Sequence, residues 1–288
     1  MPRPVCITYD STCDLTPQLL ERFQIRTVPL TIQSGERVFA DDGQYTSADL
    51  YADYRRNGTL PKTAAVSPEE FKSFFSPILE EGYDIVHIDI SSELSCTCQN
   101  AVLAAQELAE QGRVYVVDSR QLSTGGGLLA LQGAKLRDSG MDAADVAGEL
   151  RGLASCGDTS FVLDTLEYMW KGGRCSGVAA LGANVLKLKP CLEMREGKLV
   201  VCKKYRGAMG KVYRQYITER LAGKTVVEDH AFITHSGEVS EDTLRELTEL
   251  VRELAPFKEV FITQAGCTVS SHCGPGTLGV LFLRQPAQ

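Results

Sequence analysis

The chain has 288 residues, of which 43% are apolar and 23% charged, and its net charge is −7 at neutral pH. This length favours about two domains of ~150 residues each, and the acidic balance gives no reason to expect nucleic acid as a partner. No apolar run reaches the about 18 residues of a membrane span, and the first ten residues lack the apolar core of a secretory signal, so we expect a cytoplasmic protein.

The first half of the chain alternates short apolar strands with helices. Expected strands are Val5–Tyr9, Thr27–Ile32, Ile85–Ile90 and Val114–Val117, and expected helices start at Thr16, Ser67, Ser95, Leu122 and Ala143. Ser67 is followed by Pro68 and by Glu70 at the third helical position, which is the pattern of a capping box. Such alternation predicts an N-terminal, mostly parallel sheet with helices on both faces.

The second half predicts another α/β unit. A hairpin is expected at Pro190–Cys202, turning at Glu196-Gly197, and it is followed by helices at Lys211–Leu221 and Glu241–Leu254 and strands at Ala231–His235, Glu259–Thr263 and Leu278–Leu283. We place the boundary near Ser160, which gives an N-terminal domain of residues 1–160 and a C-terminal α/β domain of residues 161–288.

Three polar segments follow predicted strands of the first domain: Asp10-Ser11-Thr12, Ser91 to Thr97, and Asp118-Ser119-Arg120. Ligands of parallel α/β sheets bind at the carboxyl ends of the strands, so these segments predict a polar rim. Ser95-Cys96-Thr97 lies where a strand gives way to a helix, and the free amides there favour a carboxylate or phosphate. The alternative is that Ser95 simply caps the helix.

A glycine run, Ser123 to Gly127, fits neither a P-loop nor a dinucleotide-binding fingerprint. It predicts close helix packing or the approach of backbone to a ligand. Arg174 and Arg206 lie beside glycines and are either solvated surface charges or cations of a site. The ten cysteines lack zinc-ligand spacing, so we interpret them as small buried hydrophobic residues and expect no metal.

Gly274-Pro275-Gly276 predicts a tight turn that holds His272, two residues earlier, at a rigid corner. A polar group fixed beside the apolar run from Thr277 to Leu283 suits a single polar contact in an apolar site. The alternative is an incidental histidine on a surface hairpin. The chain lacks a Gly-x-Ser-x-Gly elbow, so Ser95 and His272 are weak evidence for a serine hydrolase.

Taken together, six segments resemble the DegV family of bacterial fatty-acid-binding proteins. They are Asp10 to Leu15, Lys62 to Ser67, Ser91 to Asn100, Asp118 to Gly127, Gly172-Gly173-Arg174 and His272 to Gly276. Each segment is common by itself, but their order and spacing across essentially the whole chain are specific.

The resemblance implies a two-domain protein that buries one long-chain fatty acid in a tunnel between its domains. The carboxylate would contact Thr63, Ser95 and His272, and the further ligand-binding positions would be Thr97, Ser123, Gly125, Gly274 and Arg174. Some family members present the fatty acid to a separate ATP-binding kinase subunit, which forms an acyl phosphate. Arg174 and Arg206 would then face that partner or the transferring phosphate, and the chain itself would be a carrier without a catalytic residue or a cofactor.

Two segments depart from the family pattern, at three positions. Ala64 and Ala65 replace a serine and a glutamine, and Cys96 replaces a glycine beside the carboxylate. Two other functions therefore stay open: an acyl- or phosphoryl-transfer enzyme with Ser95 or Cys96 as nucleophile, and a lipid-sensing regulatory protein.

Overall fold

A computed structural model of the chain describes residues 3–174 and 188–285. Its first sheet is parallel throughout, with the strand order β2-β1-β6-β7. The strands are β1 (Val5–Asp10), β2 (Ile25–Val28), β6 (Asp84–Asp89) and β7 (Val114–Asp118). Each strand contributes apolar side chains to both faces, as a sheet covered on two sides requires.

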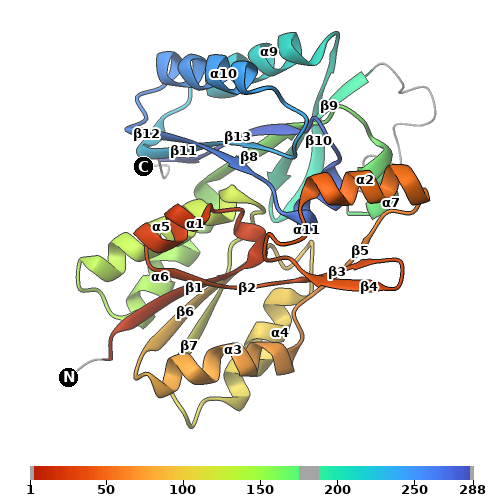
Figure 1. Ribbon diagram of the computed structural model, residues 1–288. Coiled ribbons are helices and arrows are strands. Elements are labelled where there is room, and N and C mark those ends of the chain that lie inside the picture. The colour runs from red at the N-terminus through yellow and green to blue at the C-terminus, as the bar shows by residue number, and fades with distance from the viewer. Residues whose placement is uncertain (1–2, 175–187, 286–288) are drawn as a thin grey trace.

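Helices cover both faces of this sheet, as predicted (Figure 1). On one face lie α3 (Pro68–Glu80) and α4 (Thr97–Glu107). On the other lie α1 (Pro17–Arg22), α5 (Thr124–Asp138) and α6 (Ala143–Leu153). The capping box at the start of α3 is confirmed, because Ser67 and Glu70 each accept a hydrogen bond from the other's backbone amide.

The second sheet has the strand order β10-β9-β8-β13-β11-β12 and is antiparallel except between β11 and β12. Its strands are β8 (Gly157–Val162), β9 (Leu188–Arg195), β10 (Lys198–Arg206), β11 (Val226–His235), β12 (Glu259–Gln264) and β13 (Leu278–Arg284). Helices α9 (Met209–Leu221) and α10 (Glu241–Leu254) cover its outer face. The chain thus enters the second sheet at Gly157, and residue 160 lies inside β8.

Helix α5 lies between the two sheets, and its leucines share one core with Phe232, Leu281 and Leu283 of the second sheet (Figure 1). The glycine run at its start allows this double contact. A β-carbon added at Gly125 would collide with the Thr159 hydroxyl, and one at Gly126 would collide with the Tyr9 hydroxyl. Of the two readings of this run, the structure therefore shows close helix packing.

A third, small sheet with the order β4-β3-β5 lies beside the other two. It comprises β3 (Thr31–Ser34), β4 (Arg37–Ala40) and β5 (Lys62–Ala64), and α2 (Ser47–Asn57) lies between β4 and β5 in the chain. This segment packs against α7 (Glu167–Gly172) and α11 (Cys267–Cys273) through an apolar cluster that includes Tyr51, Tyr168 and Cys267. Early and late parts of the chain therefore share a core here.

Several predicted elements need correction. The single strand expected over Thr27–Ile32 is two strands in different sheets, since Pro29 lacks an amide donor and ends β2. The helices expected from Ser95 and Leu122 begin two residues later, at Thr97 and Thr124. Among the described residues, no helix combines the length and the apolar character that crossing a bilayer requires.

Candidate functional site

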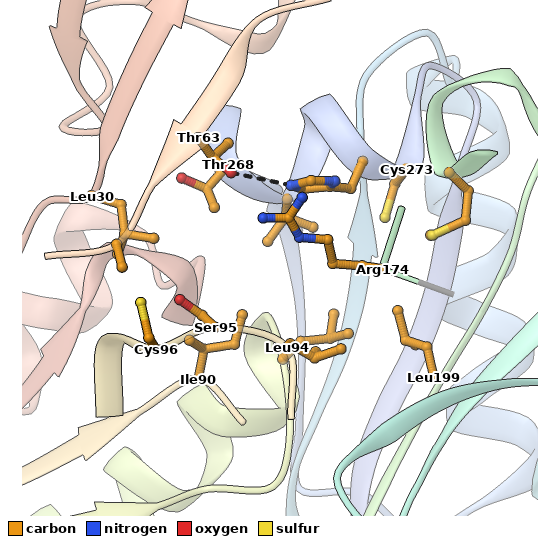
Figure 2. Close-up of a pocket in the computed structure, with 15 residues that line it drawn as sticks. Leu30, Thr63, Ile90, Leu94, Ser95, Cys96, Arg174, Leu199, Thr268 and Cys273 are labelled. Carbon is orange, nitrogen blue, oxygen red and sulfur yellow. Dashed lines mark hydrogen bonds between the residues drawn. The ribbon is translucent and has the colours of Figure 1, made fainter. Parts of the chain in front are cut away.

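A cavity of about 320 Å³ opens between the first sheet's strand ends and the second sheet, near the lower limit of the usual size of small-molecule sites. Its wall is mostly apolar and comes from β5, the loop before α4, α7, β10 and α11. The lining residues are Leu30, Thr63, Ala65, Ile90, Leu94, Ser95, Cys96, Leu122, Met169, Arg174, Leu199, Thr268, Val269, His272 and Cys273. Figure 2 shows Ile90, Leu94 and Leu199 on the side opposite Thr63.

Polar side chains from distant segments meet at this cavity. Thr63 Oγ1 lies 3.2 Å from His272 Nε2, a hydrogen bond between β5 and α11. Ser95 lies in the loop before α4, and its Oγ accepts from the Thr97 amide at 3.2 Å and lies 2.7 Å from Thr97 Oγ1. The Arg174 guanidinium lies beside the Thr63 hydrogen bond (Figure 2). Hydroxyl and imidazole groups of this kind can hold a carboxylate.

His272 is neutral at physiological pH. Burial, and then the nearby Arg174 charge, lower the pKa of its imidazole to about 4. Its Nδ1 has no hydrogen-bond partner among the described residues and faces Gly172, where an added β-carbon would collide with the ring. The sequence placed this histidine at a turn, but it lies in the last turn of α11, and Gly274 and Gly276 after it adopt positive φ.

Acidic side chains of the first domain hold the beginning of α11. This helix has no side-chain cap of its own at Gly266. Instead, the Gly266 amide donates to Asp14 Oδ1 at 2.8 Å, and the Cys267 and Thr268 amides donate to Asp41 Oδ1 and Oδ2 at 2.8 and 3.1 Å. The position of His272 is therefore tied to the first domain across more than 200 residues of sequence.

A second, small cavity lies next to the main one and is mostly apolar. It measures about 20 Å³ and shares Leu122, Val269 and Cys273 with the main cavity. Ser123 lines this small cavity, although its hydroxyl donates to Asp14. The lining of this small cavity comes from the segment before α5, from α11 and from the second sheet.

Five expected site residues lie outside the lining of the main cavity, and one of them, Ser123, lines only the small cavity. Thr97 is buried and contacts Ser95, while Gly125 packs against Thr159 in the interior. Gly274 ends α11, and a β-carbon there would meet the Tyr168 ring. Arg206 is exposed at the end of β10.

Sequence reasoning missed three residues that the structure brings to the site. Thr268 lines the cavity one helical turn before His272, and its hydroxyl has no partner among the described residues. Asp14 and Asp41 position α11. The i, i+4 spacing of Thr268 and His272 on one helix was the available signal for the threonine, whereas no local pattern marks Asp41.

Comparisons with known proteins agree with the motifs. A family model described as "uncharacterised protein, DegV family" matches residues 4–285. The structure of a DegV family protein from Thermus thermophilus, reported for its fatty acid binding, is 31% identical with a TM-score of 0.87 and covers 98% of this chain and 99% of its own. A DegV lipid-binding protein from Thermotoga maritima is 27% identical with a TM-score of 0.86, covering 99% of this chain and 100% of its own.

A further structure shares the fold at lower identity. It is the fatty acid kinase B3 protein of Streptococcus pneumoniae loaded with linoleic acid, which is 22% identical with a TM-score of 0.83 and covers 98% of this chain and 100% of its own. The resemblance inferred from the sequence motifs is confirmed. Because the family model spans nearly the whole chain, this protein belongs to the DegV family.

Proposed function

We propose that this protein binds one long-chain fatty acid in the cavity between its domains, with the carboxylate at Thr63, Ser95 and His272. The observation that carries the proposal is the placement of these three polar side chains, from three distant segments, on an otherwise mostly apolar wall. The Thermus and Thermotoga proteins, whose folds match over nearly the whole chain, are described as binding fatty acid and lipid.

The energetics favour such a ligand. Burial of an acyl chain contributes about 0.8 kcal/mol per methylene, so ten methylenes contribute about 8 kcal/mol, which can offset the cost of association. A buried carboxylate needs donors, because an unpaired one costs many kcal/mol. The Thr63 and Ser95 hydroxyls and the His272 Nε2–H group can supply three, and the Arg174 charge adds attraction.

We further propose that the chain is a carrier and not a catalyst, and that it presents the carboxylate to a separate ATP-dependent kinase. Arg174 lies at the polar side of the cavity, whereas Arg206 is exposed on β10 and outside the lining. This separation supports two different roles, in which Arg174 contacts the ligand and the transferring phosphate and Arg206 contacts the partner protein. No cofactor other than the bound fatty acid is needed in this role.

Organic extraction and mass spectrometry of protein purified from bacteria test the binding proposal. We expect co-purified fatty acid, and we expect His272→Ala to weaken binding of added fatty acid about 5- to 150-fold, the equivalent of the about 1–3 kcal/mol of an unpaired group. Protein that neither contains nor binds fatty acid would refute the proposal.

The carrier role needs its own experiment, because lipid binding alone does not establish it. Arg206→Ala should keep fatty acid affinity while acyl-phosphate formation with a bacterial fatty acid kinase ATP-binding subunit slows. Arg245→Ala, at an exposed arginine of α10, is the matched control and should change neither. If Arg206→Ala leaves the rate of phosphotransfer unchanged, Arg206 does not contact the partner protein in the proposed way.

A further inference from the structure

Two cysteines face each other across the hairpin formed by β9 and β10. The antiparallel register pairs Cys191 with Lys203, and the pairing shifts between Val201 and Lys203, which leaves Cys202 in a β-bulge. Val201 packs toward the cavity, whereas Tyr205 packs with Cys191 under α9. The bulge is therefore where β10 changes face, and a bulged residue lies opposite the single residue of the partner strand.

The two side chains are in contact but differ in exposure. The Cys202 thiol donates to the Cys191 carbonyl oxygen at 3.4 Å, and the two thiols lie near enough for each to shift the pKa of the other. Cys191 is only 3% exposed, while Cys202 is exposed. An oxidant in solution can therefore reach Cys202 first, with a second sulfur already beside it.

The local electrostatics favour the thiolate at the exposed position. The neighbouring Cys191 thiol lowers the pKa of the Cys202 thiol, partial burial and Glu193 oppose this, and Arg220 lowers it further. The Cys202 thiol, together with burial, raises the pKa of Cys191. Since thiolates are the nucleophilic form, Cys202 is the attacking sulfur and Cys191 the proton-bearing neighbour.

We propose that Cys202 and Cys191 form a peroxide-oxidisable dithiol, which converts reversibly into a disulfide between β9 and β10. The Cys202 thiolate attacks one oxygen of hydrogen peroxide, the O–O bond breaks, and hydroxide leaves, giving Cys202 sulfenic acid. The Cys191 sulfur then attacks the Cys202 sulfur, the S–O bond breaks, and the Cys191 proton leaves with the hydroxide as water. Two electrons pass from the sulfurs to peroxide, and a dithiol reductant restores both thiols.

Peptide mapping of the purified, reduced full-length protein tests this proposal. The folded protein is exposed briefly to a small excess of hydrogen peroxide, and its remaining free thiols are alkylated with one reagent. Disulfides are then reduced, and the thiols released are alkylated with a second, distinguishable reagent. We expect a Cys191–Cys202 disulfide, with the loss of two free thiols per chain, and its removal by dithiothreitol. Oxidation of Cys202 should be at least about tenfold faster than that of Cys96, another exposed cysteine of the described residues.

Variants separate the two roles. Cys191→Ser should stop at Cys202 sulfenic acid, which dimedone traps, and Cys202→Ser should give neither product. Cys96→Ala is the matched control and should keep the disulfide. If circular dichroism shows that Cys191→Ser is poorly folded, the result for Cys202→Ser, at the exposed site, tests the proposal by itself. Persistence of the thiol loss in Cys202→Ser, or oxidation of Cys202 no faster than that of Cys96, would overturn the proposal.

Discussion

Asp41 lies in the loop after β4, far in sequence from the helix that it holds. It is 7% exposed, and its two carboxylate oxygens accept the Cys267 and Thr268 amides at the start of α11. Because α11 has no cap of its own, Asp41→Ala would leave two buried amide donors without partners. The same change would loosen the helix that carries His272.

The size of the effect follows from these two contacts. A hydrogen bond to a charged group contributes about 1.5–3 kcal/mol, and loss of a helix N-cap costs about 0.5–2 kcal/mol. Allowing for partial solvation of the freed amides, we expect Asp41→Ala to lower the free energy of unfolding by about 3 kcal/mol. In a thermal scan this corresponds to a fall in Tm of about 6–12 °C.

Urea denaturation followed by circular dichroism measures this loss. The matched control is Asp42→Ala, since Asp42 is an exposed neighbour that bonds only locally, to the Gln44 amide and side chain, among the described residues. The control should change the free energy of unfolding by less than about 0.5 kcal/mol. A loss for Asp41→Ala no larger than that of the control would refute the idea that the first domain holds α11 through this carboxylate.

Three further predictions concern titration and packing. Burial raises the Asp14 pKa to about 8, so the folded state keeps a proton that the unfolded state loses. The free energy of unfolding should therefore fall as the pH rises from about 4 to 8. Asp14→Asn should remove this pH dependence in urea titrations. The pKa of His272 is lowered to about 4, so the contribution of its neutral ring to the free energy of unfolding is lost as the pH falls from about 6.5 to 4. The ligand-free His272→Gln variant should not show this loss in the same urea titrations. Gly126→Ala should cost about 2 kcal/mol, because the added β-carbon collides with Tyr9. At Gly148 an added β-carbon meets no other part of the structure within 4 Å, so Gly148→Ala should stabilise α6 by about 0.5–1 kcal/mol in thermal scans.

Local patterns predicted the elements that carry their own signals. The Ser67 capping box and the turn at Glu196-Gly197 appear where the sequence places them, and the alternation of strands and helices predicted the parallel sheet. Helix α2 was missed although Thr46 and Asp49 form a capping box. Strand β4, largely exposed, has no period-two pattern to reveal it, and its pairing with β3 is a tertiary property.

The candidate site was less accessible to local reasoning. Thr63 and His272 are separated by 209 residues, and nothing near either one indicates that their side chains meet. Only the ordered family motifs connected them with Ser95. The role of Asp41 depends on amides in α11, so it could not be inferred before the two segments were placed together.

The position of α5 has a consequence for how the interior is reached. Because this helix completes the cores of both sheets, drawing the sheets apart would expose Phe232, Leu281 and Leu283 at about 1.5–3 kcal/mol each. We therefore expect that the two sheets do not separate when the cavity is filled or emptied. We expect a bound molecule to exchange through small local movements of the segments around the cavity opening, while the two sheets remain packed against α5.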